Sequence, residues 1–161
     1  MSSETVYFYD TTLRDGAQTR GVDFSARDKL ALLAELDAFG MDYVEAGWPG
    51  ANPLDDQVFS SLPPLKSTRV AAFGMTRRHG RSAANDPGLA AVLNSPAPVA
   101  CLVGKAWDFQ VKVALGVSAE ENLEMIASSV HEGASRGREV IFDAEHFFDG
   151  WQANPAYALR C

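Results

Sequence analysis

Five short apolar segments, each followed by a helix-like stretch, recur along the 161-residue chain and limit the folds open to it. The predicted strands cover residues 6–9, 43–46, 69–74, 99–103 and 139–142. Near-continuous apolar strands separated by helices are typical of a parallel sheet with right-handed crossovers. The sequence therefore predicts an α/β fold built from five successive strand-helix units.

Helix signals lie between these strands. Ser25 and Asp28 form a predicted capping box for a helix that ends at Gly40. Ser118 and Glu121 form a second one, which opens a helix with a predicted apolar face. That face consists of Leu123, Ile126, Ala127, Val130 and Ala134. Shorter helices are predicted at 55–62 and 86–93, and Asn154 with Pro155 is predicted to start a last one.

Two architectures fit five such units, and the polar residues discriminate between them. The chain could form a flavodoxin-like open sheet, which its length favours, or the first part of an eight-unit barrel of ~250 residues. Every predicted strand is followed by groups capable of chemistry: Asp10, Arg14, Asp15; Glu45; Arg77, Arg78; Lys105, Asp108; Asp143, Glu145, His146. In a barrel these strand ends converge on one mouth, and the chain has no Gly-rich nucleotide turn that would suit an open sheet. We therefore expect a partial (β/α)8 TIM barrel of about five strand-helix units, spanning residues 1–161 with no second domain.

The turn after the first predicted strand, Tyr9-Asp10-Thr11-Thr12-Leu13-Arg14-Asp15-Gly16, concentrates two acids and an arginine at a strand end. Chemistry in α/β folds is kept at such ends. The alternative interpretation is structural. Asp10 and Thr12 would then only satisfy the backbone of a tight turn, with Arg14 and Asp15 paired in solvent.

Charge and composition limit the classes of binding partner and the cellular location that the chain can have. The formal charge of −7 and the isoelectric point near 4.9 argue against a nucleic-acid surface, which needs clustered lysine and arginine. No apolar stretch approaches the ~20 residues of a membrane span. The start, Met1-Ser2-Ser3-Glu4, lacks the basic and apolar regions of a signal peptide, so a cytoplasmic location is expected. Cys101 and Cys161 have neither metal-site nor disulfide-framework spacing.

Four segments resemble a known family. The opening YDTTLRDGAQ, residues 9–18, resembles the signature of the isopropylmalate and citramalate synthases, relatives of hydroxymethylglutaryl-CoA lyase in a metal-dependent barrel superfamily. The segments VEAGWPG, GKAWD and FDAEHFFDG are similar to the (R)-citramalate synthase branch in particular. The resemblance implies the N-terminal part of a synthase-type, pyruvate carboxyltransferase-like barrel domain. It also implies condensation of acetyl-CoA with pyruvate to (R)-citramalate and CoA, a step of isoleucine and branched-chain amino-acid biosynthesis.

The resemblance also implies roles for individual residues. Arg14 would face the keto-acid oxygen or its alkoxide, and Asp15 would be a ligand of a divalent metal ion (Mg, Mn or Zn), which suits a hard carboxylate. Glu145 would help to hold the acyl substrate as a catalytic residue, and Glu45 would line the mouth. Substrate-binding roles are further expected for Gln18, Lys105, His146 and Arg77.

Several of these residues have a structural alternative. Glu45 could pair with Arg14, Arg77 or Lys105 around a polar rim, because charges at a barrel mouth usually pair. Lys105 and Arg77 could contact CoA phosphates or could be solvated loop charges. His146 could orient Glu145, bind substrate or make a structural hydrogen bond.

One departure from the family pattern is large. The superfamily's metal site also takes two histidines from a later His-x-His pair, which does not occur in these 161 residues. The implied metal site is therefore incomplete in this chain, which is expected to need a C-terminal half or a homo-oligomer. Three hypotheses follow: a citramalate-synthase part that is inactive alone, a 2-isopropylmalate-synthase-type acyltransferase using another keto acid, or a non-catalytic fragment.

Overall fold

The strands of the computed structural model, which describes residues 5–161, form one sheet in the order β1-β2-β3-β4-β5. The strands are β1 (Tyr9–Asp10), β2 (Tyr43–Gly47), β3 (Arg69–Met75), β4 (Val99–Lys105) and β5 (Glu139–Glu145). They are parallel, and Tyr9 lies opposite Tyr43 while Val44 lies opposite Val70. Sequential order excludes the 2-1-3-4-5 order of a flavodoxin-like sheet. The predicted partial barrel is therefore confirmed. Residues 1–4, on which the expectation about a signal peptide rests, lie outside the described residues.

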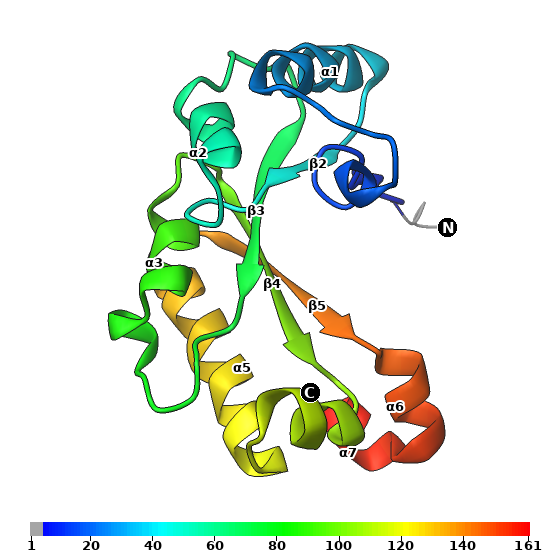
Figure 1. The fold of residues 1–161 in the computed structure, drawn as a ribbon, viewed down its shortest axis with the longest axis vertical. Coiled ribbons are helices and arrows are strands. Elements are labelled where there is room, and N and C mark those ends of the chain that lie inside the picture. Colours follow the sequence, from blue (N-terminus) through cyan, green and yellow to red (C-terminus); the bar gives the residue numbers. More distant parts are fainter. Residues whose placement is uncertain (1–4) are drawn as a thin grey trace. The chain divides into compact units, whose positions relative to one another are not determined.

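Helices follow the strands in alternation (Figure 1). They are η1 (Gly16–Gln18), α1 (Ala26–Phe39), α2 (Pro53–Ser60), η2 (Ala83–Asn85), α3 (Pro87–Asn94), α4 (Asp108–Gln110), η3 (Val111–Leu115), α5 (Ala119–Ser135), α6 (Phe147–Ala153) and α7 (Pro155–Arg160). The Ser25–Asp28 capping box is present in both directions, and Gly40 ends α1 in the left-handed conformation.

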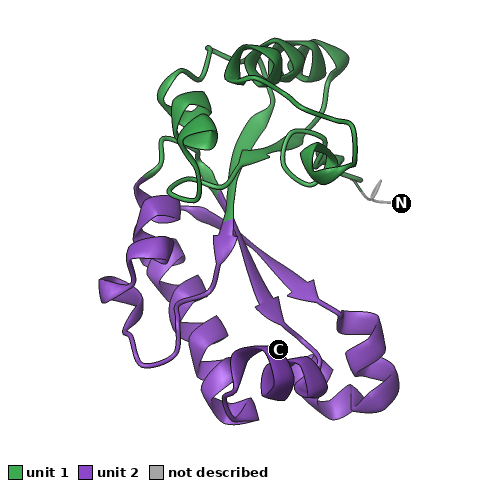
Figure 2. Ribbon diagram, in the orientation of Figure 1, with its two compact units in different colours: residues 1–73, 95–99 green, residues 74–94, 100–161 purple. Residues whose placement is uncertain are grey.

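The contacts divide the chain into two compact units, each with its own core (Figure 2). The first contains the residues up to Phe73 with Ser95–Val99, and Leu33, Val44 and Val58 are fully buried in it. The second contains Gly74–Asn94 with Ala100–Cys161, and Leu102 is fully buried there.

The first predicted strand was placed too early. Residues 6–9 were expected to be extended in the sheet, but β1 contains only Tyr9 and Asp10, and Val6, Tyr7 and Phe8 are mostly exposed. The neighbouring strand limits β1, because β2 begins at Tyr43, which lies opposite Tyr9. The Phe8 carbonyl still accepts from the Tyr43 amide at 3.0 Å, but the Phe8 amide donates to the Asp42 side chain at 2.8 Å instead of to a strand.

Two helices differ from prediction for local reasons. Helix α2 begins at Pro53 rather than Asp55, because the Asn52 side chain accepts from the Asp55 amide at 2.8 Å and proline suits the first helical position. Helix α6 was not predicted. Its Gly150 is buried where an added Cβ would lie 2.4 Å from the Ala106 carbonyl oxygen, so glycine is required by this close approach.

The predicted apolar residues of α5 lie together on one face of the helix, but most of them are not the residues that the helix buries. The helix buries Asn122, Met125, Ile126, Ser129 and Gly133, of which only Ile126 belongs to the predicted face. Small and polar residues let the helix approach β5 closely, as a Cβ on Gly133 would meet Val140 at 2.7 Å. The expected residues Leu123, Ala127, Val130 and Ala134 line an open groove of about 780 Å³ with Phe142 and Cys161.

The second predicted capping box is only half formed. Ser118 accepts from the Glu121 amide at 3.1 Å, but the Glu121 carboxylate accepts from Arg77 at 3.1 Å. An ion pair has displaced the reciprocal bond.

Candidate functional site

The turn after β1 is held by its own side chains. Asp10 accepts from the Thr12 amide at 2.9 Å and from the Thr12 hydroxyl at 3.0 Å. The amides of Arg14 and Gly16 both donate to the Thr11 carbonyl, and η1 follows directly. These bonds are the ones that the structural interpretation of Asp10 and Thr12 predicts, and they fix the turn from which Arg14 leaves the backbone.

Arg14 lies at the centre of a buried ion-pair network in the first unit. Its Nε donates to Glu45 at 2.5 Å, and an NH group lies 3.3 Å from the Asp15 carboxylate. Its Cζ sits 3.7 Å from the centre of the Phe73 ring, a cation–π stack. The Arg14 side chain is 16% exposed and lines the pocket described below.

Glu45 is the anchor of this network. Its side chain is 2% exposed, and its second oxygen accepts from the Tyr9 hydroxyl at 2.7 Å. Of the three cations considered for Glu45, the structure pairs it with Arg14. Because each carboxylate oxygen accepts one of these bonds, Glu45 holds the arginine in place.

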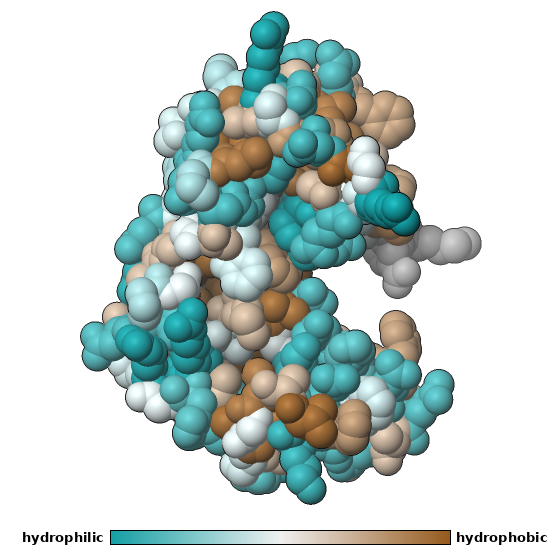
Figure 3. Space-filling model, viewed as in Figure 1, coloured by the Kyte–Doolittle hydropathy of each residue, from teal (hydrophilic) through white to brown (hydrophobic). Residues whose placement is uncertain are grey.

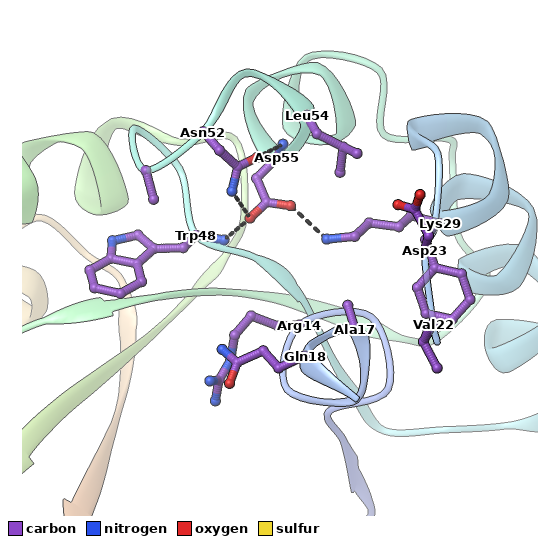
Figure 4. A pocket seen from close by; sticks show the side chains of 12 residues that line it. Arg14, Ala17, Gln18, Val22, Asp23, Lys29, Trp48, Asn52, Leu54 and Asp55 are labelled. Atoms are coloured by element: carbon purple, nitrogen blue, oxygen red, sulfur yellow. Dashed lines mark hydrogen bonds and ion pairs between the residues drawn. The ribbon is translucent and has the colours of Figure 1, made fainter. Parts of the chain in front are cut away.

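A pocket of about 450 Å³ opens beside Arg14 in the same unit (Figure 4). Gln18, predicted to bind substrate, lines it together with Lys29, Trp48 and Asp55. The Gln18 and Arg14 side chains lie on one side of this pocket and Asp55 on the other.

The second unit brings together Lys105, Glu145 and His146 at the ends of β4 and β5. Lys105 Nζ forms an ion pair with Glu145, and His146 Nε2 lies 3.9 Å from the same carboxylate. His146 has a left-handed backbone, with φ of 60°, and its ring packs against Trp107 at 6.2 Å. Positive φ is uncommon outside glycine and here turns β5 sharply into α6. The Glu145 side chain is 39% exposed, so it is accessible to a ligand.

Arg77 is tied into the second unit by its side chain. Its Nε donates to Ser128 at 2.8 Å, and an NH group donates to Arg81 carbonyl at 2.9 Å and to Glu121. The Arg77 guanidinium is the main cause of the lowered pKa of Glu121. The side chain is only 8% exposed, so these bonds support the structural alternative, and its substrate-binding role stays a prediction.

Asp15 is the one residue of this chain that was expected to bind the divalent metal ion. Its side chain is 61% exposed and lies against Arg14. No group of three or more His, Cys, Asp or Glu side chains able to hold a metal occurs within residues 5–161. One exposed carboxylate does not make a metal site, so the residues of this chain do not by themselves fit the ion that the fold family implies.

Several residues of the first-unit site were not singled out from the sequence: Tyr9, Lys29, Asp55, Trp48 and Phe73. Their partners lie 26 or more residues away or depend on the packing of β2 against β3. The only local signal was Asn52-Pro53, a helix start that would have placed Asp55 in the first turn of α2.

Comparison with known proteins agrees with this architecture. The HMGL-like family model matches residues 5–158, so the chain belongs to the HMGL-like family, and its five parallel strands form a curled half-barrel. Hydroxymethylglutaryl-CoA lyase from Brucella melitensis superposes with a TM-score of 0.67 at 17% identity, covering 87% of this chain and 48% of the lyase.

Among relatives of known name, the chain is more similar to citramalate synthases than to 2-isopropylmalate synthases. The chain is 46% identical to (R)-citramalate synthase of Aquifex aeolicus over 160 residues, which is 98% of this chain and 30% of the relative. A 2-isopropylmalate synthase of Solidesulfovibrio magneticus is more distant, at 30% identity over 96% of the chain and 29% of its own length. The chain therefore spans under a third of the length of these synthases. No helix within residues 5–161 is both long and apolar enough to cross a bilayer.

Proposed function

We propose that this chain is the N-terminal part of a citramalate-synthase-type acyltransferase, which condenses acetyl-CoA with pyruvate and, as water hydrolyses the thioester of the condensation product, gives (R)-citramalate and CoA. The reaction would serve isoleucine and branched-chain amino-acid synthesis in the cytoplasm. Identity of 42–46% to citramalate synthases, against about 30% to isopropylmalate synthases, supports this choice.

One observation carries the proposal: a guanidinium pre-positioned at a strand end. Glu45, Phe73 and the turn hold Arg14, whose side chain remains 16% exposed and lines the pocket. When the acetyl carbon attacks the keto carbon, negative charge develops on the keto oxygen. A fixed cation there stabilises that charge without reorganising.

The other residues would bind and orient substrates. Gln18, on the same side of the pocket as Arg14, can donate to the keto-acid carboxylate. Lys105 holds Glu145 in place, so Glu145 and His146 are available to contact the acyl substrate. Asp15 remains the candidate ligand for a divalent ion whose other ligands would come from outside these residues.

The proposal is tested by supplying the missing part in trans. The purified chain is mixed with the C-terminal portion of the Aquifex aeolicus citramalate synthase, and thiol release from acetyl-CoA is followed with and without pyruvate. We expect pyruvate-dependent release from the mixture and none from the chain alone. Release by the chain alone, abolished by a chelator, would show that its own residues complete the metal site.

The same assay separates the alternatives. Preference for a keto acid with a branched side chain would favour an isopropylmalate-synthase-type enzyme. If the two parts form a complex but no keto acid stimulates release, the chain is a non-catalytic fragment and the proposal fails.

A further inference from the structure

The first unit contains a second buried ion pair, away from Arg14. Lys29 on α1 and Asp55 on α2 are joined by an Nζ–Oδ1 bond of 2.6 Å, with side chains 5% and 7% exposed. Lys29 Nζ also lies 3.4 Å from the Ala46 carbonyl oxygen at the end of β2. Desolvating two charges is costly, and hydrophobic residues often stabilise such a position equally well. The pair therefore calls for an explanation other than stability.

The loop between β2 and α2 is folded around the Asp55 carboxylate. Its Oδ2 accepts from the Trp48 amide at 2.9 Å and from the Asn52 side chain at 3.0 Å. A Cβ on Gly47, whose φ is 157°, would lie 2.6 Å from this carboxylate, so only glycine allows the approach. Figure 4 shows Asp55 between Lys29 on one side and Trp48 and Asn52 on the other.

The loop in turn supports the arginine. The Trp48 ring packs edge-on against Phe73, with ring centres 5.3 Å apart at 82°. Phe73 is the ring on which the Arg14 guanidinium stacks at 3.7 Å. Contacts therefore run without a break from Lys29 through Asp55, Trp48 and Phe73 to Arg14.

We propose that Lys29 and Asp55 are positioning residues for Arg14: the pair fixes the loop after β2, and the loop places Trp48 against the ring that carries the guanidinium. Lys29 and Asp55 line the same pocket as Arg14, but the role proposed for them acts through the loop and the Phe73 ring rather than through contact with the reacting atoms. That this positioning matters for catalysis rests on the proposed function of Arg14. That Lys29 and Asp55 hold the loop and the guanidinium in place can be tested on the chain alone.

The test uses nuclear magnetic resonance on the full 161-residue chain. Lys29→Met keeps a stem of similar length but removes the charge, and Arg27→Met, an exposed position on the same helix, is the matched control. We expect Lys29→Met to speed hydrogen exchange at the Trp48 amide about tenfold or more, because a charge-assisted bond is lost, and to shift the Arg14 Nε–H resonance. Arg27→Met should change neither. A folded Lys29→Met chain with both signals unchanged would overturn the proposal.

A second variant covers the case in which Lys29→Met does not fold. Asp55→Asn retains one acceptor oxygen where the carboxylate used two, so it must lose either the Lys29 bond or the Trp48 bond. We expect the same two signals to move. If both variants unfold, or if Asp55→Asn moves neither signal, the pair serves only stability and the proposal is rejected.

Activity is a separate readout. In the enzyme completed in trans, Lys29→Met should lower kcat by about tenfold to a hundredfold, the size expected for a small misplacement, with the KM for acetyl-CoA unchanged. A completed enzyme that is inactive even with the native chain, while the resonance signals respond as expected, would overturn the proposed function and leave this inference standing.

Discussion

Glu45→Gln is the substitution whose effect on stability follows most directly from the structure. Glu45 is 2% exposed and accepts from both Arg14 and Tyr9, whereas glutamine offers one acceptor oxygen and no charge. Breaking a buried pair costs about 3–5 kcal/mol. The Arg14 side chain is 16% exposed and keeps Asp15 and the Phe73 ring, so we expect a smaller loss, about 2–3 kcal/mol.

The assay is urea unfolding at a protein concentration where the oligomeric state is constant. Glu35→Gln, an exposed position in the same unit, is the matched control and should change the free energy of unfolding by less than about 0.5 kcal/mol. Tyr9→Phe should cost about 1 kcal/mol, because Glu45 keeps its bond to Arg14. A Glu45→Gln loss no larger than that of Glu35→Gln would refute the buried network.

Three further predictions concern stability and association. Amides of Lys66, Ser67 and Thr68 donate to Asp37 and lower its pKa, so its contribution to stability should be present above pH ~4 and lost in more acidic solution as the pH falls through the lowered pKa. Asp37→Asn should therefore destabilise the chain in urea at pH 7, and the difference between the two chains should shrink only below pH ~4. Gly150→Ala should lower the free energy of unfolding in urea by about 1–3 kcal/mol, because the added Cβ would meet the Ala106 carbonyl. Gly16→Ala, whose added Cβ would have no contact under 3.7 Å, is the control and should lower it by less. The isolated chain should self-associate, because β1 and β5 end the sheet and Phe8, Phe148 and Leu159 are among its exposed apolar residues. Figure 3 shows brown, apolar areas on the face that it draws. Light scattering at micromolar concentration that shows only monomer, with no binding of an apolar dye, would contradict this prediction.

The alternation of strands and helices could be predicted from the sequence because it depends on local patterns. Apolar runs located β2 to β5, and the Ser25 capping box located α1. The sequence did not predict features that depend on packing against a neighbouring element. The start of β2 limits β1, and close packing on β5 decides that α5 buries Ser129 and Gly133, which the apolar pattern of the helix did not mark.

The site could be predicted only as a set of residue types. The motif identified Arg14 and Glu45, but the sequence left three cations open as partners of Glu45, and the structure selects Arg14. The contact of Phe73 with Arg14 and the pairing of Lys29 with Asp55 depend on segments far apart along the chain, for which a single sequence carries no pairing signal.

The central claim is that Arg14 serves the condensation, and the most direct test is its removal from the enzyme completed in trans. Arg14→Ala should lower pyruvate-dependent thiol release by about a hundredfold or more, the effect of losing a preorganised charge at an oxyanion. Arg20→Ala, at an exposed position six residues further along the chain, is the control and should retain activity. A folded Arg14→Ala enzyme that releases thiol as fast as the Arg20→Ala enzyme would contradict the claim.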